Sequence, residues 1–287
     1  VLMVPYFGLV HPILEQAHWH DLRENTVLAH PVFAGYHMMV LDSLLTPAWL
    51  AVAFAVLVLA SVAWLVAARR DGGLIIPRGY LYPALNAAAH ENGVKVIMSV
   101  GGWGNCVGFP GMASTATNRR RFVTQVVNFC RKNTYDGLDL DWEFVSNDEE
   151  RRNFSSLVKE LSAAFRAQQP PLQLSMASPA GDYYGRWIAF EELVPYFDYI
   201  GFMTYDFHGP WSDHSGHNAP LYASGGDSCG SVHDSYVYAH SVRKIPNRKI
   251  LLGVPFYGRS FDCAGLRQPF TESGDYTYAD VRKLAPS

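Results

Sequence analysis

The sequence has little of what would mark several common classes of protein. Only 17% of its 287 residues are charged, and a formal net charge of -3 leaves no basic stripe for nucleic acid. Four cysteines, none in a Cys-x-x-Cys pair, are too few for a disulfide-scaffolded fold and do not indicate zinc or thiol redox chemistry. No Gly-x-Gly-x-x-Gly motif opens a helix after the first clear strand, which disfavours a dinucleotide fold. We expect no nucleic-acid partner, no cofactor and no metal.

Long uncharged runs are also rare, and the one exception lies near the amino terminus. The segment 48–68 carries no charged residue, follows Pro47 and ends before Arg69 and Arg70. It is long enough to cross the ~30 Å hydrocarbon core as a helix, so we expect a candidate transmembrane helix there. A buried helix or core strand is the alternative. Residues 1–70 are otherwise left unassigned.

From about Asp71 the pattern becomes regular, with short apolar runs alternating with helix-length segments. The runs are too continuous for one-sided strands, which favours a parallel sheet covered by helices. The architecture is therefore α/β, and the local pattern leaves open a closed eight-stranded barrel or an open doubly wound sheet. The strand candidates are NGVKVIMSVGGW, YDGLDLDWEF, LQLSMASPA, FDYIGFMTYD and RKILLGVPFYGRSF, and the helix candidates are residues 81–91, 118–131, 153–166 and, more weakly, 231–242.

The second of these runs concentrates acids in an otherwise weakly charged chain. In an extended strand Asp139, Asp141 and Glu143 share one face, while the intervening leucines and tryptophan share the other. Neighbouring carboxylates repel, so at least one should hold a proton at neutral pH. A proton retained in this way makes a general acid, and Glu143, nearest the strand's carboxyl end, is the natural donor. A calcium site or a solvated acidic edge is the less favoured alternative, because calcium loops are usually polar and turn-like.

Four separated motifs together resemble one enzyme family. DGLDLDWE resembles the Asp-Gly-x-Asp-x-Asp-x-Glu signature of glycoside hydrolase family 18, the chitinase family, and SVGGW, MTYD and GVPFYGRSF resemble its other strand motifs in the same order. The resemblance covers about residues 71–287. It implies a (β/α)8 TIM-type barrel and hydrolysis of β-1,4-linked N-acetylglucosamine polymers, so the expected partner is chitin or chitooligosaccharides.

The resemblance also implies a mechanism in which the substrate's acetamide replaces a protein nucleophile. Glu143 would then be the general acid, Asp141 would orient the acetamide, Asp139 would tune Asp141, and Tyr205 would hydrogen-bond the acetamide carbonyl. Asp136, which opens the motif, is expected to be structural. The expected substrate-binding residues are Trp103, Gly102, Met203, Asp206, Met176, Tyr183, Tyr257, Arg259 and Trp211, with Asp206 as an alternative partner for Arg259.

Departures from the family pattern predict a barrel that is incomplete at both ends. The family's first strand has no better candidate than AVAFAVLVL, inside the uncharged run, and residues 270–287 resemble the start of a small inserted domain. A chitinase should meet its polymer outside the cell, so we expect a monomer that is extracellular or anchored through residues 48–68 with its catalytic part outward. In an exported protein, Cys106 and Cys229, each in a loop after a parallel strand, are expected to form a disulfide.

Two other functions share the acidic motif. One is a chitin-binding, lectin-like relative that has lost catalysis, although the retention of Asp139, Asp141 and Glu143 argues against it. The other is an endo-β-N-acetylglucosaminidase acting on N-glycans, which the chitinase-like motifs MTYD and GVPFYGRSF disfavour.

Overall fold

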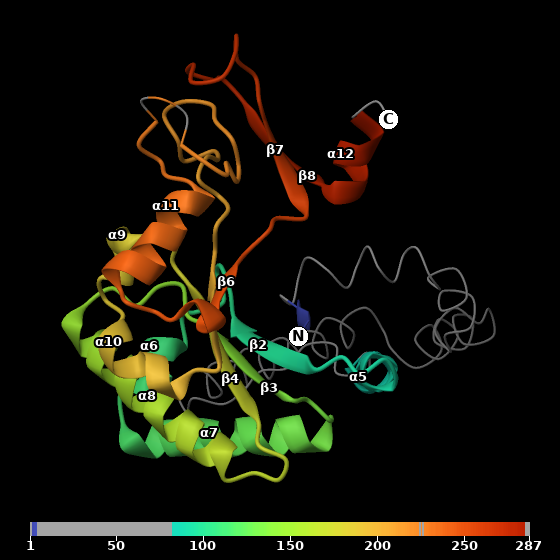
Figure 1. Ribbon diagram of the computed structural model, residues 1–287, viewed down its shortest axis with the longest axis vertical. Coiled ribbons are helices and arrows are strands. Elements are labelled where there is room, and N and C mark those ends of the chain that lie inside the picture. Colours follow the sequence, from blue (N-terminus) through green and yellow to red (C-terminus); the bar gives the residue numbers. More distant parts are fainter. Residues whose placement is uncertain (1, 5–81, 224, 226, 285–287) are drawn as a thin grey trace, which may run out of the picture.

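The computed structural model describes residues 2–4, 82–223, 225 and 227–284. In this part of the chain, six strands form one parallel sheet, and two further strands form a separate antiparallel pair (Figure 1). The six are β1 (Leu2–Val4), β2 (Val96–Gly101), β3 (Gly137–Asp141), β4 (Gln173–Ser178), β5 (Tyr199–Phe202) and β6 (Ile250–Leu252).

The order of the strands decides between the two α/β architectures. Each strand pairs in parallel with the next along the chain, from β1 to β6, without a reversal. A doubly wound sheet reverses its strand order near the middle, whereas a TIM-type barrel adds its strands in sequence. The described sheet therefore has the TIM-type order.

Helices follow most of the strands, as the apolar periodicity predicts. The four expected helical segments correspond to α5 (Tyr82–Glu91), α7 (Ala116–Lys132), α8 (Asp148–Arg166) and α11 (Val232–Val237), the last continued by a π-helical turn at Tyr238–Val242. The short helices α6 (Phe109–Ala113), α9 (Asp182–Gly185) and α10 (Phe190–Leu193) were not predicted, because fewer than two turns cannot show a helical period.

The start of α8 is fixed by residues immediately after the acidic strand. Asn147 accepts a hydrogen bond from the Glu150 backbone N–H at 2.9 Å, and the Glu150 carboxylate accepts one from the Ser146 backbone N–H, also at 2.9 Å. Three acidic residues in the first turn suit the positive end of the helix dipole. The connection from β3 to α8 is therefore short and well defined.

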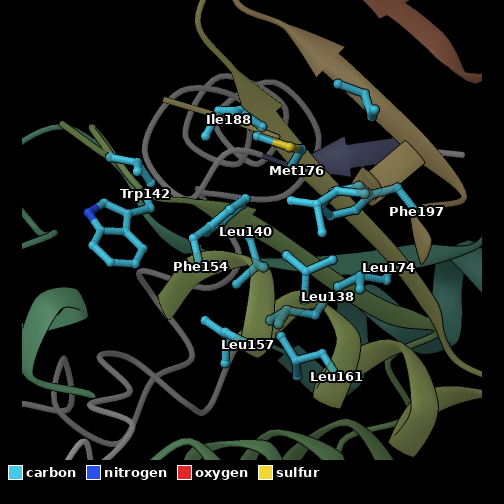
Figure 2. Close-up of a cluster of buried hydrophobic side chains, with 14 of the residues drawn as sticks. Leu138, Leu140, Trp142, Phe154, Leu157, Leu161, Leu174, Met176, Ile188 and Phe197 are labelled. Carbon is cyan, nitrogen blue, oxygen red and sulfur yellow. The ribbon is translucent and has the colours of Figure 1, made fainter. Parts of the chain in front are cut away.

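The hydrophobic core lies between β3, β4 and the covering helices (Figure 2). Leu138 and Leu140 are fully buried, and their register partners on β4 are Leu174 and Met176. These side chains face Phe154, Leu157 and Leu161 of α8, which Figure 1 shows running alongside both strands. The opposite face of β3 is left for its acids.

The last predicted strand run is divided in the structure. RKILLGVPFYGRSF contributes β6 to the main sheet and then β7 (Tyr257–Phe261), which pairs with β8 (Ser273–Thr277) ahead of α12 (Tyr278–Leu284). Figure 1 shows this hairpin and α12 extending away from the six-stranded sheet. The expectation of a single strand here was wrong, because the chain leaves the sheet after Leu252.

Two predictions concern the amino-terminal region. The candidate transmembrane helix 48–68 and the strand candidate AVAFAVLVL lie outside the described residues. Among the helices of the described part, none combines the length and apolar character required for a bilayer span. The neighbour of β2 is instead Leu2–Val4, a strand that the sequence pattern did not predict.

Candidate active site

The acids on β3 alternate with core residues as the strand pattern predicts. Asp139 is 4% exposed and faces away from Leu138 and Leu140, and Asp141 ends the strand on the same face. Glu143 follows two residues later and is half-buried. The carboxyl ends of barrel strands form the catalytic face, so the row runs from the interior toward that face.

Asp139 is the deepest member of the row and lies between two serines. The Ser175 hydroxyl donates to Asp139 Oδ1 at 2.6 Å, and the Ser99 hydroxyl donates to Oδ2 at 3.2 Å. Burial raises the pKa of Asp139 to about 6, although both hydrogen bonds act in the opposite direction. Asp139 is therefore a fixed carboxyl that can take up a proton near neutral pH.

Asp141 holds its proton more strongly. Burial, followed by the charges of Glu143 and Asp139, raises the pKa of Asp141 to about 8. Its Oδ1 atom is buried without a hydrogen-bond partner among the described residues. A buried carboxyl oxygen with no partner is unusual in a folded protein, and a substrate amide N–H would satisfy it.

Two glycines at the end of β2 allow the chain to approach Asp141. Gly101 has φ +114°, and a Cβ there would lie 2.0 Å from the Asp141 carbonyl oxygen. Gly102 has φ +90°, and a Cβ would lie 3.6 Å from Asp141 Oδ2. Its backbone N–H donates to the Asp141 carbonyl at 2.9 Å. Glycine is needed at Gly101 for this close approach and at Gly102 for its positive φ, so both residues border the acid row.

Glu143 also has a raised pKa. Burial is the largest cause, the charge of Asp206 adds to it, and a backbone hydrogen bond from Trp103 opposes it. The Glu143 backbone N–H donates to the Cys106 sulfur at 3.1 Å, which fixes the main chain at this residue. Glu143 is thus an acid that tends to keep its proton and lies near the solvent-facing end of the row.

Tyr205 and Asp206 approach the acids from the end of β5. Burial, and then the charges of Asp141 and Glu143, raise the pKa of Tyr205, so its hydroxyl remains a neutral donor. Asp206 Oδ1 accepts hydrogen bonds at 2.6 Å from the Tyr257 hydroxyl and from Arg259 Nη2. The sequence left open whether Arg259 contacts sugar or Asp206, and the structure shows the contact with Asp206.

Aromatic side chains remain open to solvent around these groups. Trp103 is 80% exposed, Tyr183 is 73% exposed and Trp211 is 61% exposed. The Arg259 guanidinium lies 4.7 Å from the centre of the Trp211 ring, which holds that ring against the polar network. Exposed rings of this kind offer apolar area with a polar edge, which suits the face of a sugar.

Met203 and Asp136 lie next to the ends of strands of the parallel sheet. Met203 follows β5 directly, and its backbone N–H donates to the Ser178 carbonyl at 2.9 Å. Asp136 accepts hydrogen bonds from the Val96 backbone N–H at 2.7 Å and is 2.8 Å from His90 Nε2. These contacts join the starts of β3 and β2 to α5, in keeping with a structural role for Asp136.

The structure corrects two of the sequence predictions. Met176 pairs with Leu140 and is 2% exposed, and Figure 2 shows it within the cluster of buried hydrophobic side chains, so it cannot line the substrate site. The predicted Cys106–Cys229 disulfide is absent, since both thiols are free. Cys106 is buried with its sulfur 3.1 Å from the Asp141 carbonyl, whereas Cys229 is exposed beside Asp227.

The sequence did not predict several side-chain contacts around the acid row. Ser99 and Ser175 bind Asp139, and Tyr184 stacks on Phe144 with ring centres 4.2 Å apart. The serines could have been identified from their parity on β2 and β4, because both lie in strands whose other face is apolar. The stacking pair could not, since it depends on how α9 folds back after β4.

Comparison with known proteins places these features in one family. The sequence model of glycosyl hydrolases family 18 matches residues 51–285. Endochitinase 1 of Metarhizium robertsii is 37% identical over 191 residues, which cover 63% of this chain and 45% of that protein. The chain thus spans about half the length of the curated relatives it matches.

Solved structures agree with this assignment. The group IV chitinase of Ostrinia furnacalis superposes with a TM-score of 0.66 at 28% identity, over 71% of this chain and 62% of that chain. Catalytic domain 2 of the group II chitinase of the same insect, solved as a mutant with penta-N-acetylchitooctaose, gives a TM-score of 0.64 at 29% identity. That match covers 70% of this chain and 59% of the other.

Proposed function

Because the chain belongs to glycosyl hydrolases family 18, we propose that it hydrolyses β-1,4-linked N-acetylglucosamine polymers by the substrate-assisted retaining mechanism. The observation that carries this proposal is the row of three acids formed by Asp139 and Asp141 on β3 and Glu143 just after it, each with a raised pKa. Chitinases among its relatives and a solved relative in complex with a chitooligosaccharide support the substrate class.

In the first step, Glu143 donates its proton to the glycosidic oxygen, and the bond from that oxygen to the anomeric carbon breaks. The acetamide carbonyl oxygen of the same sugar attacks the anomeric carbon, which gives a cyclic oxazolinium ion in place of a glycosyl-enzyme bond. The departing chain leaves as an alcohol. Burial favours this role, because it raises the pKa of Glu143 and so makes the proton-donating form more populated than in a free glutamate.

Asp141 and Tyr205 position the acetamide during this step. The unpartnered Asp141 Oδ1 accepts the acetamide N–H, and the neutral Tyr205 hydroxyl donates to the acetamide carbonyl. Positive charge then develops on the acetamide, and the proton on Asp141 can pass toward Asp139, whose pKa is about 6. Two coupled carboxyls can in this way stabilise the cation without both being charged in the free enzyme.

In the second step, the Glu143 carboxylate removes a proton from a water molecule that attacks the anomeric carbon. The oxazolinium ring opens, the acetamide is restored and Glu143 regains its proton. Two inversions at one carbon give net retention of configuration. Trp103, which is 80% exposed, provides a ring face for a neighbouring sugar.

The proposal is tested by Glu143→Gln in the full chain, with Glu149→Gln, an exposed residue of the next helix, as the matched control. Turnover of chitooligosaccharides by the Glu143 variant should fall by a factor on the order of 100 to 10,000, while binding persists, because an amide keeps the shape but has no acidic proton. The control should retain wild-type turnover. Undiminished cleavage by Glu143→Gln would exclude Glu143 as the acid.

Substrate assistance is tested with the substrate itself. A fully deacetylated glucosamine polymer should bind without being cleaved, and a thiazoline analogue of the cyclic intermediate should inhibit. Efficient cleavage of the deacetylated polymer would require a protein nucleophile instead. Binding of chitooligosaccharide without turnover by the unmodified chain would favour the lectin-like alternative, and cleavage confined to a glycoprotein would favour the N-glycan enzyme.

A further inference from the structure

A second group of reactive side chains lies in the loop between β5 and α11. His208, His214, Asp227 and Cys229 come from separate positions in this loop, yet their ligand atoms all lie within 4.8 Å of one another. The side chains of His208 and Asp227 are 0% and 6% exposed, and Cys229 lies at the surface. None of the four has a role in the acid row.

The hydrogen bonds of the two histidines fix where their protons are. His208 Nδ1 lies 3.0 Å from the carbonyl oxygen of His217, and His214 Nδ1 contacts the Asp213 carboxylate. Both partners can only accept, so each Nδ1 carries the proton and each Nε2 of the neutral ring carries a lone pair. Metal-binding histidines are commonly oriented in this way by a carbonyl or a carboxylate.

The two Nε2 atoms face each other at a distance of 3.3 Å. Asp227 Oδ2 lies 3.3 Å from His208 Nε2, and Asp227 Oδ1 lies 3.9 Å from His214 Nε2. Lone pairs and a carboxylate at these distances repel unless a cation or an extra proton lies among them. For a tetrahedral zinc ion with Zn–N bonds of about 2.0 to 2.1 Å, two ligand nitrogens are separated by roughly 3.3 Å.

The loop backbone is shaped to bring these groups together. A Cβ at Gly216 would lie 2.3 Å from the His208 ring, so glycine is needed where the loop closes over that ring. The Cys229 backbone N–H donates to Asp227 Oδ1 at 2.9 Å, which holds the cysteine beside the carboxylate. The fold therefore builds this arrangement. The side chains of His208 and Asp227 are almost fully buried, and the Nδ1 atom of each histidine has a defined partner.

We propose that His208, His214, Asp227 and Cys229 form a structural binding site for one zinc ion. Two imidazole nitrogens, one carboxylate oxygen and one thiolate are the ligand types that zinc takes in four-coordinate structural sites. Calcium and magnesium prefer oxygen ligands and do not suit this set. The site replaces the expectation of no metal, which rested on the absence of a recognised ligand spacing in the sequence.

A metal at this position would fasten the loop that follows β5. His208 lies two residues after Asp206, whose carboxylate binds Tyr257 and Arg259. The same loop pairs with the β7–β8 connection, where Ser215 N–H donates to the Gln268 carbonyl at 2.9 Å. Zinc would thus hold together distant parts of the loop between β5 and α11, which lies beside Asp206, and it would not contact the substrate.

The test measures metal binding by the full chain after treatment with a chelator. Zinc titration against a competing chelator should show one equivalent bound per chain, and cobalt substituted for zinc should give the visible bands of a tetrahedral ion with a thiolate charge-transfer band. Cys229→Ser should remove that charge-transfer band, and Asp227→Asn and His214→Ala should weaken zinc binding at least roughly tenfold. Cys263→Ser and His233→Ala, outside the cluster, are the matched controls and should bind as the unmodified chain does.

Three outcomes would contradict the proposed zinc site. Absence of stoichiometric zinc binding, or binding that is unchanged in the Asp227 and His214 variants, would overturn the proposal and leave a shared proton between the histidines as the explanation. Because Cys229 is exposed, its serine variant should fold even if the others do not. A charge-transfer band that survives in Cys229→Ser would likewise exclude the site. The readout is independent of chitin hydrolysis, so failure of one proposal does not affect the other.

Discussion

Replacing Asp141 with asparagine should remove the loss of stability that the protein shows as pH rises, while the variant loses activity. Burial and two neighbouring acids raise the pKa of Asp141 from 3.8 to about 8. Between these values the folded state binds a proton that the unfolded state has released. The free energy of unfolding therefore falls as pH rises through this window, and the stability is fully present only in acid. An amide cannot ionise and removes this loss.

The magnitude follows from the size of the shift. Each pKa unit corresponds to 1.36 kcal/mol, so a shift of about four units sets an upper bound of roughly 5 to 6 kcal/mol at pH 8. The neighbouring carboxyls share the proton, which lowers this figure. A buried amide without a partner costs about 1 to 3 kcal/mol at every pH, so this cost shifts the whole curve of the variant and cancels from its change with pH. We therefore expect the difference in unfolding free energy, variant minus wild type, to rise by roughly 2 to 4 kcal/mol from pH 4.5 to pH 8.

The assay is urea unfolding of the two proteins at pH 4.5, 6 and 8, read by tryptophan fluorescence and circular dichroism. Asp148→Asn, an exposed residue in the first turn of α8, is the matched control and should reproduce the wild-type dependence on pH. Parallel curves for Asp141→Asn and wild type across this range would refute the reasoning, because they would mean that Asp141 ionises alike in both states.

Two further predictions concern substrate contacts. Tyr205→Phe should lower kcat/KM for chitooligosaccharides about 100-fold, because it removes a donor to the acetamide carbonyl. Tyr222→Phe, at an exposed position, is the control and should have no effect. Equal activity of both variants would contradict this role of Tyr205. Trp103→Ala should raise KM by a factor of about 5 to 10, because it removes a ring face for a sugar. The free energy of unfolding should change by less than about 0.5 kcal/mol, since the ring is 80% exposed. An unchanged KM would show that no sugar stacks on Trp103.

Much of the acid-bearing strand β3 was predictable, because its evidence is local. The alternation in DGLDLDWEF predicts which side chains share a face, and Leu138, Leu140 and Asp139 lie accordingly. Burial is the largest cause of the raised pKa of Asp141 and depends on the fold, whereas the added effect of Glu143 and Asp139 follows from acids placed two residues apart in the sequence. Met176 was misassigned because it was carried over from a motif, whereas its register with Leu140 places it on the helix side.

Other parts of the site depend on contacts between distant segments. Cys106 and Cys229 both follow parallel strands, but one sulfur binds the backbone at the end of β3 and the other lies on a surface loop. Topology places loops on a common face without fixing the direction of a side chain within them. A disulfide needs that direction as well as proximity, so it could not be predicted from strand order alone.

The sequence by itself determined the α/β class, the four main helices and the acid row, since each depends on periodicity within a single segment. Only the tertiary structure decided the order of the strands, the hydrogen bonds from Tyr257 and Arg259 to Asp206, and the meeting of His208 with Asp227. These features join residues that lie far apart in the chain. Their positions depend on the path of loops, whose conformation is set by packing and hydrogen bonds and leaves no periodic trace in the sequence.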